Sequence, residues 1–229
     1  VLVLVVAAIV AIAAVAGGDS KKKAAAPTGT GPVTALPYAE ETARMFAGIP
    51  QKGDVLGPDD APVTMVEYID IQCPYCNEFE TQAFDSIVEK YVKTGKVRVV
   101  VRPLAFIGDD SVRGRNVLIA AAAQNRMFDL AQILYYNQGK ENSGWLDDNM
   151  VRAAVGSIQG LDLGRILSER DSDAVKKQAA AYDAQGQADG ITGTPTVLVG
   201  KTGQTPAVVS FTSYTDPKAV EAAIDKALG

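Results

Sequence analysis

The feature that most constrains this sequence is a seven-residue run, Val63 to Ile69, that is followed at once by a helical pattern and another apolar run. The first run is rich in β-branched and aromatic residues and is apolar on both faces, which predicts a central strand buried on both sides. From Pro74 to Val92 the apolar residues recur at helical spacing, and Gly95 ends that segment. Residues 97–102 then form a second predicted strand. A strand–helix–strand unit of this kind favours a parallel pair.

The rest of the chain is predicted to be helical and then to return to strands. A long helical stretch extends from about residue 110 to residue 190. Strand patterns return at residues 196–199 and 207–211, and the loop between them predicts an antiparallel hairpin. A last helix is predicted after Asp216, with Pro217 at its first position. The predicted fold class is therefore α/β, in the order βαβ, helical block, ββα, around a central mixed sheet.

Composition and charge exclude several classes of protein. The 229 residues are 47% hydrophobic and carry a net charge of −5. Neither a basic nucleic-acid-binding protein nor a disordered chain has this balance. The chain has no histidine and only two cysteines. Ser-His-Asp triads, Cys-His pairs and histidine-ligated zinc or haem are therefore excluded, and two cysteines cannot complete a four-cysteine metal site.

Residues 1–18 are predicted to be a membrane anchor or a signal segment. Val1 to Ala16 is apolar throughout, and as a helix it would span roughly 24 Å against a hydrocarbon core of about 30 Å. The small residues Ala14 to Ala16 suit signal-peptide cleavage. We favour an uncleaved anchor, although Lys21 to Lys23 on its expected outer side runs against the positive-inside tendency; a buried core helix is a third alternative. Whether this segment is an anchor or a signal peptide, the rest of the chain is expected to be exported.

Residues 19–50 are predicted to be a linker that contains a short helix between Tyr38 and Phe46. Most of this segment is rich in Lys, Pro and Gly and has no apolar period. The globular domain is then expected to occupy residues 51–229.

The chemistry of the sequence is concentrated in Cys73-Pro74-Tyr75-Cys76, where the first strand ends and the helix begins. Pro74 suits a first helical turn, which needs no N–H at that position. Cys73 then lies at the helix N-terminus, whose free N–H groups and dipole favour a thiolate. Cys76, one turn further on, is expected to be more buried and to act as the resolving thiol. The alternatives are a zinc half-site, which lacks further ligands, and an inert disulfide, which would stabilise little across so short a loop.

Two further features accompany the cysteines. Glu67 interrupts the apolar strand before Cys73, and a buried carboxylate is costly unless it has a partner or a function. It could relay the proton of Cys76; the alternatives are a salt bridge or an exposed strand end. Pro195, in Gly193-Thr194-Pro195, precedes a strand. A cis peptide bond there would make a fixed kink, and an ordinary turn is an equal alternative.

Together these residues resemble the thioredoxin superfamily and, within it, the DsbA-like disulfide oxidoreductases. The likeness rests on Glu67, on Cys73-Pro74-Tyr75-Cys76 and on Thr194-Pro195. It covers about residues 53–228. The predicted helical block, about residues 104–190, is similar to the helical domain that DsbA-like proteins insert into the thioredoxin fold.

The resemblance implies a role for each of these residues. Cys73 would be the nucleophile and Cys76 the resolving cysteine, with Pro195 cis beside them. Thr194 would present backbone groups that pair with an extended substrate strand. The two residues between the cysteines, Pro74 and Tyr75, would shape the active site.

Tyr75 is the main departure from the pattern. The strongly oxidising DsbA type carries histidine between its cysteines, whereas tyrosine brings no positive charge to the thiolate. We therefore predict a less acidic Cys73 and a less oxidising disulfide than in that type. Cys-Pro-Tyr-Cys also occurs in glutaredoxins and in DsbG-like isomerases, and Thr before the cis-proline is common among isomerases. Those isomerases place a dimerisation domain ahead of the catalytic one, where we expect only a linker.

We expect an exported enzyme that forms disulfide bonds in exported proteins by exchange at Cys73 and Cys76. We expect it to be tethered to the cytoplasmic membrane, with its catalytic domain on the outer face. Its partners would be unfolded or reduced exported proteins and a DsbB-like or VKOR-like membrane redox protein, with no nucleic acid. The sulfurs would need no metal or organic cofactor. Two other functions remain open: a membrane-tethered thiol reductase or isomerase, because sequence does not set the direction of electron flow, and a non-enzymatic binding module on a thioredoxin scaffold.

Overall fold

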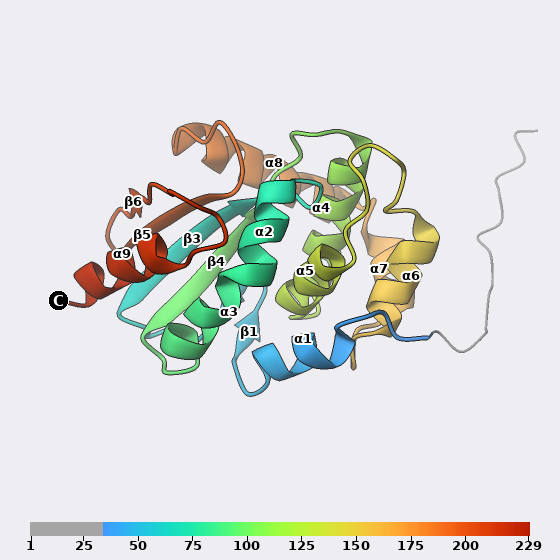
Figure 1. Ribbon diagram of the computed structural model, residues 1–229. Coiled ribbons are helices and arrows are strands. Elements are labelled where there is room, and N and C mark those ends of the chain that lie inside the picture. Colours follow the sequence, from blue (N-terminus) through green and yellow to red (C-terminus); the bar gives the residue numbers. More distant parts are fainter. Residues whose placement is uncertain (1–33) are drawn as a thin grey trace, which may run out of the picture. The chain divides into compact units, whose positions relative to one another are not determined.

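A computed structural model describes residues 34–229 of the chain (Figure 1). The predicted anchor or signal segment, residues 1–18, and the first part of the predicted linker lie outside the described residues. Between residues 34 and 229, no helix is both long enough and apolar enough to cross a membrane.

A six-stranded mixed sheet forms the centre of the fold, in the order β1-β2-β4-β3-β5-β6. β3 and β4 run parallel, as predicted, and the other neighbouring pairs are antiparallel. The strands are β1 Gln51–Lys52, β2 Val55–Leu56, β3 Val63–Ile69, β4 Val97–Pro103, β5 Thr196–Lys201 and β6 Ala207–Val208. The predicted α/β class and central mixed sheet are confirmed.

β3 takes the central position because both of its faces can be buried. It pairs with β4 on one side and β5 on the other, and every residue in it except Thr64 is buried. Successive side chains of a strand point to opposite faces of the sheet. Tyr68 therefore lies against Gly186 of one helical layer, whereas Glu67 faces the opposite layer, where it meets Glu80. β3 thus delivers functional groups to both layers.

Helices cover the sheet on both faces (Figure 1). One layer consists of α2 Pro74–Gln82, α3 Phe84–Ile87, a π-helical turn Val88–Val92 and α9 Lys218–Leu228. A single helix was predicted over residues 74–92, but it is divided at Ala83, whose φ of −113° departs from regular helical geometry. The predicted apolar face of this segment is nevertheless buried, and the hydroxyl of Tyr91 donates to Asp225 of α9 at 2.9 Å.

Five helices lie between β4 and β5, where the helical insertion was predicted. They are α4 Asp109–Ala122, α5 Met127–Tyr136, α6 Asp148–Gly156, α7 Leu163–Glu169 and α8 Asp173–Ala188. α4 and α8 contact β4, whereas α5 contacts α2. The insertion therefore reaches both the sheet and the helix that follows Cys73.

The predicted short helix is present as α1, Ala39–Phe46, but it is part of the packed fold rather than of a linker. Phe46 is buried in the core, and Tyr38 stacks on Tyr136 of α5 with ring centroids 4.5 Å apart. The packed region therefore begins before Gln51, the residue at which we expected it to start. The strands β1 and β2 were not predicted, because two residues are too few to show a period of two.

The C-terminal hairpin is shorter than predicted. Residues 207–211 were expected to form its second strand, but only Ala207–Val208 pair with β5. Phe211 instead leaves the sheet edge and packs against Phe79 of α2, with ring centroids 5.6 Å apart. Pro217 lies at the N-cap of α9, one residue before the predicted position.

Gly114 allows α4 to lie close to the chain just beyond β3. A Cβ atom added there would be 2.1 Å from Ile71 Cγ2 and 3.0 Å from Leu146 Cδ2. Alanine favours a helix over glycine by about 1 kcal/mol, but overpacking costs about 1–3 kcal/mol. The contact with Ile71 is far inside van der Waals distance, so we expect an overpacking cost of about 2–3 kcal/mol. Gly114→Ala should therefore lower the free energy of unfolding by about 1–2 kcal/mol in a urea titration. Val112→Ala, at an exposed site of the same helix, should not lower it by more than about 0.5 kcal/mol. A Gly114→Ala protein as stable as the wild type would contradict this packing.

Candidate active site

Cys73 and Cys76 meet at the start of α2, and the two thiols have very different surroundings. Cys73 is the N-cap residue of α2, with extended backbone, and Pro74 follows in the first turn. Both cysteines are free thiols; Cys73 is 5% exposed, and Cys76 is fully buried. The chain therefore presents one sulfur near the surface and keeps the other beneath it.

The surroundings of Cys73 favour its thiolate. The pKa of Cys73 is lowered to about 6, first by a hydrogen bond from the Cys76 thiol and then, against the opposing effect of burial, by contacts that include the backbone N–H groups of Cys76 and Tyr75. These are the unpaired N–H groups of a helix N-terminus. When protonated, Cys73 Sγ donates to the Thr194 carbonyl at 3.2 Å. A pKa near 6 lies between the values of about 3.5 for a strongly oxidising DsbA and about 7 for thioredoxin.

Cys76 is held as a neutral thiol. Burial raises its pKa well above the ordinary value, and the neighbouring Cys73 raises it further. Near neutral pH Cys73 is therefore the cysteine that ionises more readily, and Cys76 would have to lose a proton before it could attack a disulfide. This asymmetry suits the nucleophilic and resolving roles that we expect for the two residues.

The loop that carries Thr194 is tied to the sheet by a polar network. The Thr194–Pro195 peptide bond is cis, as the resemblance implied. The loop begins after Asp189, at the end of α8. Tyr68 donates its hydroxyl to Asp189 Oδ2 at 2.5 Å, and Arg102 donates to the same oxygen at 3.2 Å. Contacts to β3 and β4 therefore help to place the carbonyl that faces the reactive sulfur.

Glu67 is fully buried and shares its site with Glu80, which sequence reasoning missed. Neither carboxylate oxygen of Glu67 has a hydrogen-bond partner, and no cation pairs with it in the described part of the chain. Burial raises the pKa of Glu67 well above its ordinary value, and Glu80 raises it further. Burial also raises the pKa of Glu80 to about 7. Burial opposes a double negative charge on two adjacent carboxylates that have no cation, so the pair retains a proton near neutral pH.

The sequence does contain a signal for Glu80. It lies four residues after Cys76 and hence one turn further along the same face of α2. Tyr135 of α5 completes this buried cluster: its pKa is raised by burial and then by the charges of Cys76, Glu80 and Glu67. The salt bridge and the exposed strand end that we considered for Glu67 are both absent among residues 34–229. The carboxylate instead faces a second acid beneath the redox pair.

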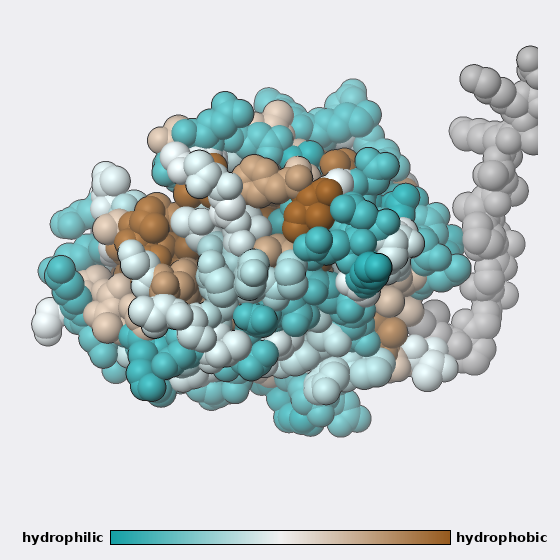
Figure 2. Space-filling model, turned by 45° about the horizontal axis from the view of Figure 1, so that its top comes forward, coloured by the Kyte–Doolittle hydropathy of each residue, from teal (hydrophilic) through white to brown (hydrophobic). Residues whose placement is uncertain are grey.

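Aromatic side chains gather beside the active-site motif. Tyr75 is 53% exposed and contacts Tyr214 at an interplanar angle of 35°, with ring centroids 5.1 Å apart, and Tyr214 contacts Phe211 in turn. Phe106, in the loop after β4, is 54% exposed. In the space-filling view, hydrophobic patches are set in a largely hydrophilic surface (Figure 2). The exposed ring of Tyr75 gives an unfolded polypeptide an apolar contact two residues after Cys73.

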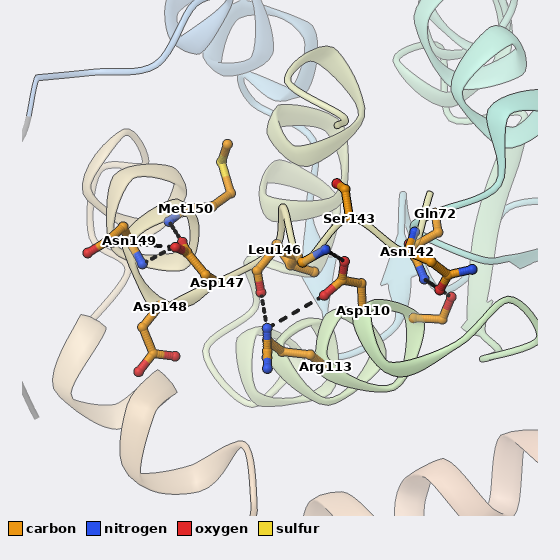
Figure 3. Close-up of polar contacts among 12 residues, drawn as sticks. Gln72, Asp110, Arg113, Asn142, Ser143, Leu146, Asp147, Asp148, Asn149 and Met150 are labelled. Carbon is orange, nitrogen blue, oxygen red and sulfur yellow. Dashed lines mark hydrogen bonds and ion pairs between the residues drawn. The ribbon is translucent and has the colours of Figure 1, made fainter. Parts of the chain in front are cut away.

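A buried carboxylate fixes the turn that leads into Cys73. Asp70 Oδ1 accepts from the backbone N–H of Gln72 at 2.9 Å and from the Ser111 hydroxyl at 2.6 Å. Asp70 Oδ2 accepts from the N–H groups of the loop after β4, including that of Phe106 at 2.7 Å. The side chain of Gln72 then contacts Asn142 of the insertion (Figure 3). We did not predict Asp70 or Gln72, because neither contact is visible as a local sequence pattern.

Comparison with known proteins places the chain in a family. The family model described as Thioredoxin matches residues 51–226. The chain belongs to the thioredoxin family. The Probable disulfide bond formation protein D of Bacillus cereus is 28% identical to this thioredoxin-family protein over 158 residues, which cover 68% of this chain and 72% of that protein.

Solved structures of DsbA type share the fold. Oxidised BdbD from Bacillus subtilis has a TM-score of 0.67 at 22% identity and covers 79% of this chain and 97% of its own. Wolbachia pipientis alpha-DsbA1 has a TM-score of 0.62 at 21% identity and covers 76% of this chain and 89% of its own. The predicted thioredoxin fold and the predicted likeness to DsbA-type oxidoreductases are confirmed.

The lowered pKa of Cys73 predicts how its alkylation depends on pH. The thiolate is the reactive form, so the rate at which iodoacetamide modifies the reduced protein should rise with pH, reach its midpoint near pH 6 and then level off. Cys76→Ala removes the hydrogen bond that lowers this pKa most, so the midpoint should move upward. Mass spectrometry of the peptides identifies the modified sulfur. If the wild-type protein instead had its midpoint near the pKa of an unperturbed cysteine, about 8.5, the described geometry would be contradicted.

Proposed function

We propose that this protein, a DsbA-like thiol–disulfide oxidoreductase, forms disulfide bonds in exported proteins. The observation that carries the proposal is the contrast between the two sulfurs: Cys73 has a lowered pKa at the start of α2, and Cys76 is buried with a raised pKa. A lowered pKa at the nucleophile stabilises the reduced enzyme, which makes its disulfide a better oxidant.

The exchange proceeds in two steps from the oxidised enzyme. A substrate thiolate attacks Cys73 Sγ, the Cys73–Cys76 bond breaks, and its electron pair leaves on Cys76, which takes up a proton. A second thiolate of the substrate then attacks the substrate sulfur of the mixed disulfide. A substrate disulfide forms, and Cys73 leaves as the thiolate. The substrate has lost two electrons, the enzyme has gained them, and no metal or organic cofactor enters either step.

Glu67 and Glu80 supply the proton that Cys76 needs. They share a buried site next to Tyr135, whose pKa the charges of Cys76, Glu80 and Glu67 all raise, and the pair retains a proton near neutral pH. When Cys76 leaves as a thiolate, the pair can protonate it. When the enzyme is reoxidised, the ionised pair can take the proton back and so free Cys76 to attack. We assign this relay to Glu67, with Glu80 setting the pKa of Glu67.

The same proposal includes a binding place for the substrate, a cellular location and a redox partner. Thr194 offers backbone groups to an extended substrate, as in related oxidoreductases, beside the exposed ring of Tyr75. The apolar segment Val1 to Ala16 would anchor the protein, with the catalytic domain on the outer face of the cytoplasmic membrane. A DsbB-like or VKOR-like membrane protein would accept the two electrons from the reduced pair.

One observation favours a second candidate function. The pKa of Cys73, about 6, is closer to the value of about 7 in thioredoxin than to the value of about 3.5 in a strong DsbA oxidant. A less acidic nucleophile suits a thiol reductase or a disulfide isomerase, which must receive electrons from a membrane donor. Both functions use the same two sulfurs and differ in the direction of electron flow.

Substitution of the cysteines tests the exchange chemistry. Oxidised wild-type protein should oxidise a reduced, unfolded model protein, measured by the loss of its free thiols. Cys73→Ser should abolish this activity, because it cannot form the Cys73–Cys76 disulfide that accepts the two electrons. Cys76→Ser should retain a nucleophile but accumulate a mixed disulfide with glutathione, which mass spectrometry detects. Retention of full activity by the Cys73→Ser protein would refute the mechanism, whereas a wild-type protein that oxidises no substrate thiols would favour a binding module on a thioredoxin scaffold.

The proton relay is tested at the step in which Cys76 attacks. Reduced enzyme is mixed with oxidised glutathione, and acid-quenched samples separate mixed-disulfide formation from its resolution. Resolution should accelerate as pH rises above the ordinary range for a carboxyl group, because burial and Glu80 raise the pKa of Glu67, which becomes a base only as it ionises. Glu67→Gln should slow this step by about tenfold or more, while mixed-disulfide formation keeps its rate.

Glu80→Gln provides the matched control for the relay. It removes the neighbour that raises the pKa of Glu67 but leaves Glu67 in place. The acceleration should therefore shift to lower pH rather than disappear. A Glu67→Gln protein that resolves the mixed disulfide at the wild-type rate at every pH would leave Glu67 with a structural role only.

A further inference from the structure

The end of α5 interlocks with the active-site turn through three side chains. Tyr135 donates its hydroxyl to the Asp70 carbonyl at 3.1 Å. Asn77, one residue after Cys76, donates its side-chain amide to the Tyr135 carbonyl at 2.5 Å. Gln138 donates to the carbonyl groups of the turn itself. The insertion therefore donates hydrogen bonds to the redox turn, and the start of α2 donates one back to the insertion.

Gln138 is the residue of the insertion that hydrogen-bonds to Cys73 itself. Its Nε2 donates to the Ile71 carbonyl at 2.9 Å and to the Cys73 carbonyl at 3.2 Å. The Cys73 carbonyl also accepts the Asn77 N–H at 3.1 Å, which closes the first turn of α2. One amide group thus joins the last part of the turn to the first part of the helix, and the Cys73 side chain projects from this junction.

The electrostatics of the junction make this donor important. α5 ends at Tyr136, so its C-terminal carbonyl groups, the negative end of the helix dipole, lie close to the redox turn. Negative potential near Cys73 opposes formation of its thiolate. The amide N–H of Gln138 brings positive potential to the same place.

Hydrogen bonds fix the backbone at Gln138 and the loop that follows it. Its own backbone N–H donates to the Tyr135 carbonyl at 3.2 Å, which fixes it to the end of α5. Further along the same loop, the Asn142 N–H donates to Gln72 Oε1 at 2.7 Å, and Gln72 Nε2 donates to the Ser111 hydroxyl at 3.1 Å. Figure 3 shows Asn142 and Gln72 facing each other where this loop meets the active-site turn.

We infer that Gln138 is a positioning residue of the redox centre: its amide fixes the Ile71 and Cys73 carbonyls and so holds Cys73 Sγ against the Thr194 carbonyl and the free N–H groups of α2. The inference rests on the proposed thiol–disulfide exchange at Cys73. It gives the helical insertion a part in setting the reactivity of the nucleophile, in addition to its part in packing. Gln138 touches no reacting atom and acts through Cys73.

The test substitutes Gln138 in the full chain and measures the ionisation of Cys73 by thiolate absorbance near 240 nm. Gln138→Met keeps the length of the side chain and removes the donor. The pKa of Cys73 should rise by about half a unit, the size expected for the loss of one favourable dipole near a charge. Gln138→Glu replaces the donor with a negative charge and should raise the pKa further. The equilibrium constant for oxidation of substrate thiols should fall about threefold in Gln138→Met.

Gln124→Met is the matched control. Gln124 also bridges an insertion helix to backbone groups, because it donates to the Asp162 carbonyl at 3.3 Å and accepts the Asp162 N–H at 2.9 Å. It is half-buried, and its side-chain hydrogen bonds go to Asp162 rather than to the redox turn. Its substitution should leave the pKa of Cys73 and the exchange equilibrium unchanged.

The outcomes separate a positioning role from a structural one. If Gln138→Met and Gln138→Glu lower the free energy of unfolding but leave the pKa of Cys73 unchanged, Gln138 only holds the insertion in place and the inference is wrong. If Gln138→Met does not fold, Gln138→Glu, with a side chain of the same shape, decides by the same absorbance. A wild-type Cys73 that exchanges no disulfides refutes the proposed function, whereas the absorbance still tests the placement of Cys73.

Discussion

The free N–H groups at the start of α2 are the feature on which the site depends. They exist because a helix leaves its first N–H groups unpaired. Pro74 fits this first turn, because proline has no N–H and none is needed at that position. β3, buried on both faces, fixes where this helix begins and so places Cys73 at its N-cap. The Cys76 thiol, one turn inside, adds the hydrogen bond that lowers the pKa of Cys73 most. The fold thus creates two unequal sulfurs from one short motif.

The same arrangement places two acids where they cost stability. Glu67 and Glu80 are buried together without a cation, and burial raises the pKa of both. A site of this kind weakens the fold, since neither group can ionise cheaply. In the proposed relay, the same site holds an exchangeable proton for Cys76, which would gain and lose one in every cycle. We therefore interpret the buried pair as part of the chemistry rather than of the core.

Sequence reasoning found the elements whose signals are local. The apolar run of β3, the helix after Pro74 and the Cys73–Cys76 pair could all be predicted, because each depends on spacing within a few residues. Other features depend on tertiary contacts, which no local pattern records. They are the division of that helix at Ala83, the shortness of β6 and the packing of α1 against the core. Gln138 was missed for the same reason, since the carbonyl groups that it contacts lie on another element. Glu80 does have a local signal in its spacing of four residues from Cys76, but its pairing with Glu67 of β3 does not.

The central claim is that the start of α2, supported by the insertion, stabilises the Cys73 thiolate enough to make the disulfide an oxidant. The reduction potential of the Cys73–Cys76 pair, measured on the full chain equilibrated in glutathione buffers, tests this most directly. The account predicts a value between about −120 and −180 mV, the range of DsbA and protein disulfide isomerase. A value near about −270 mV, as in thioredoxin, would contradict it and identify the pair as an electron donor.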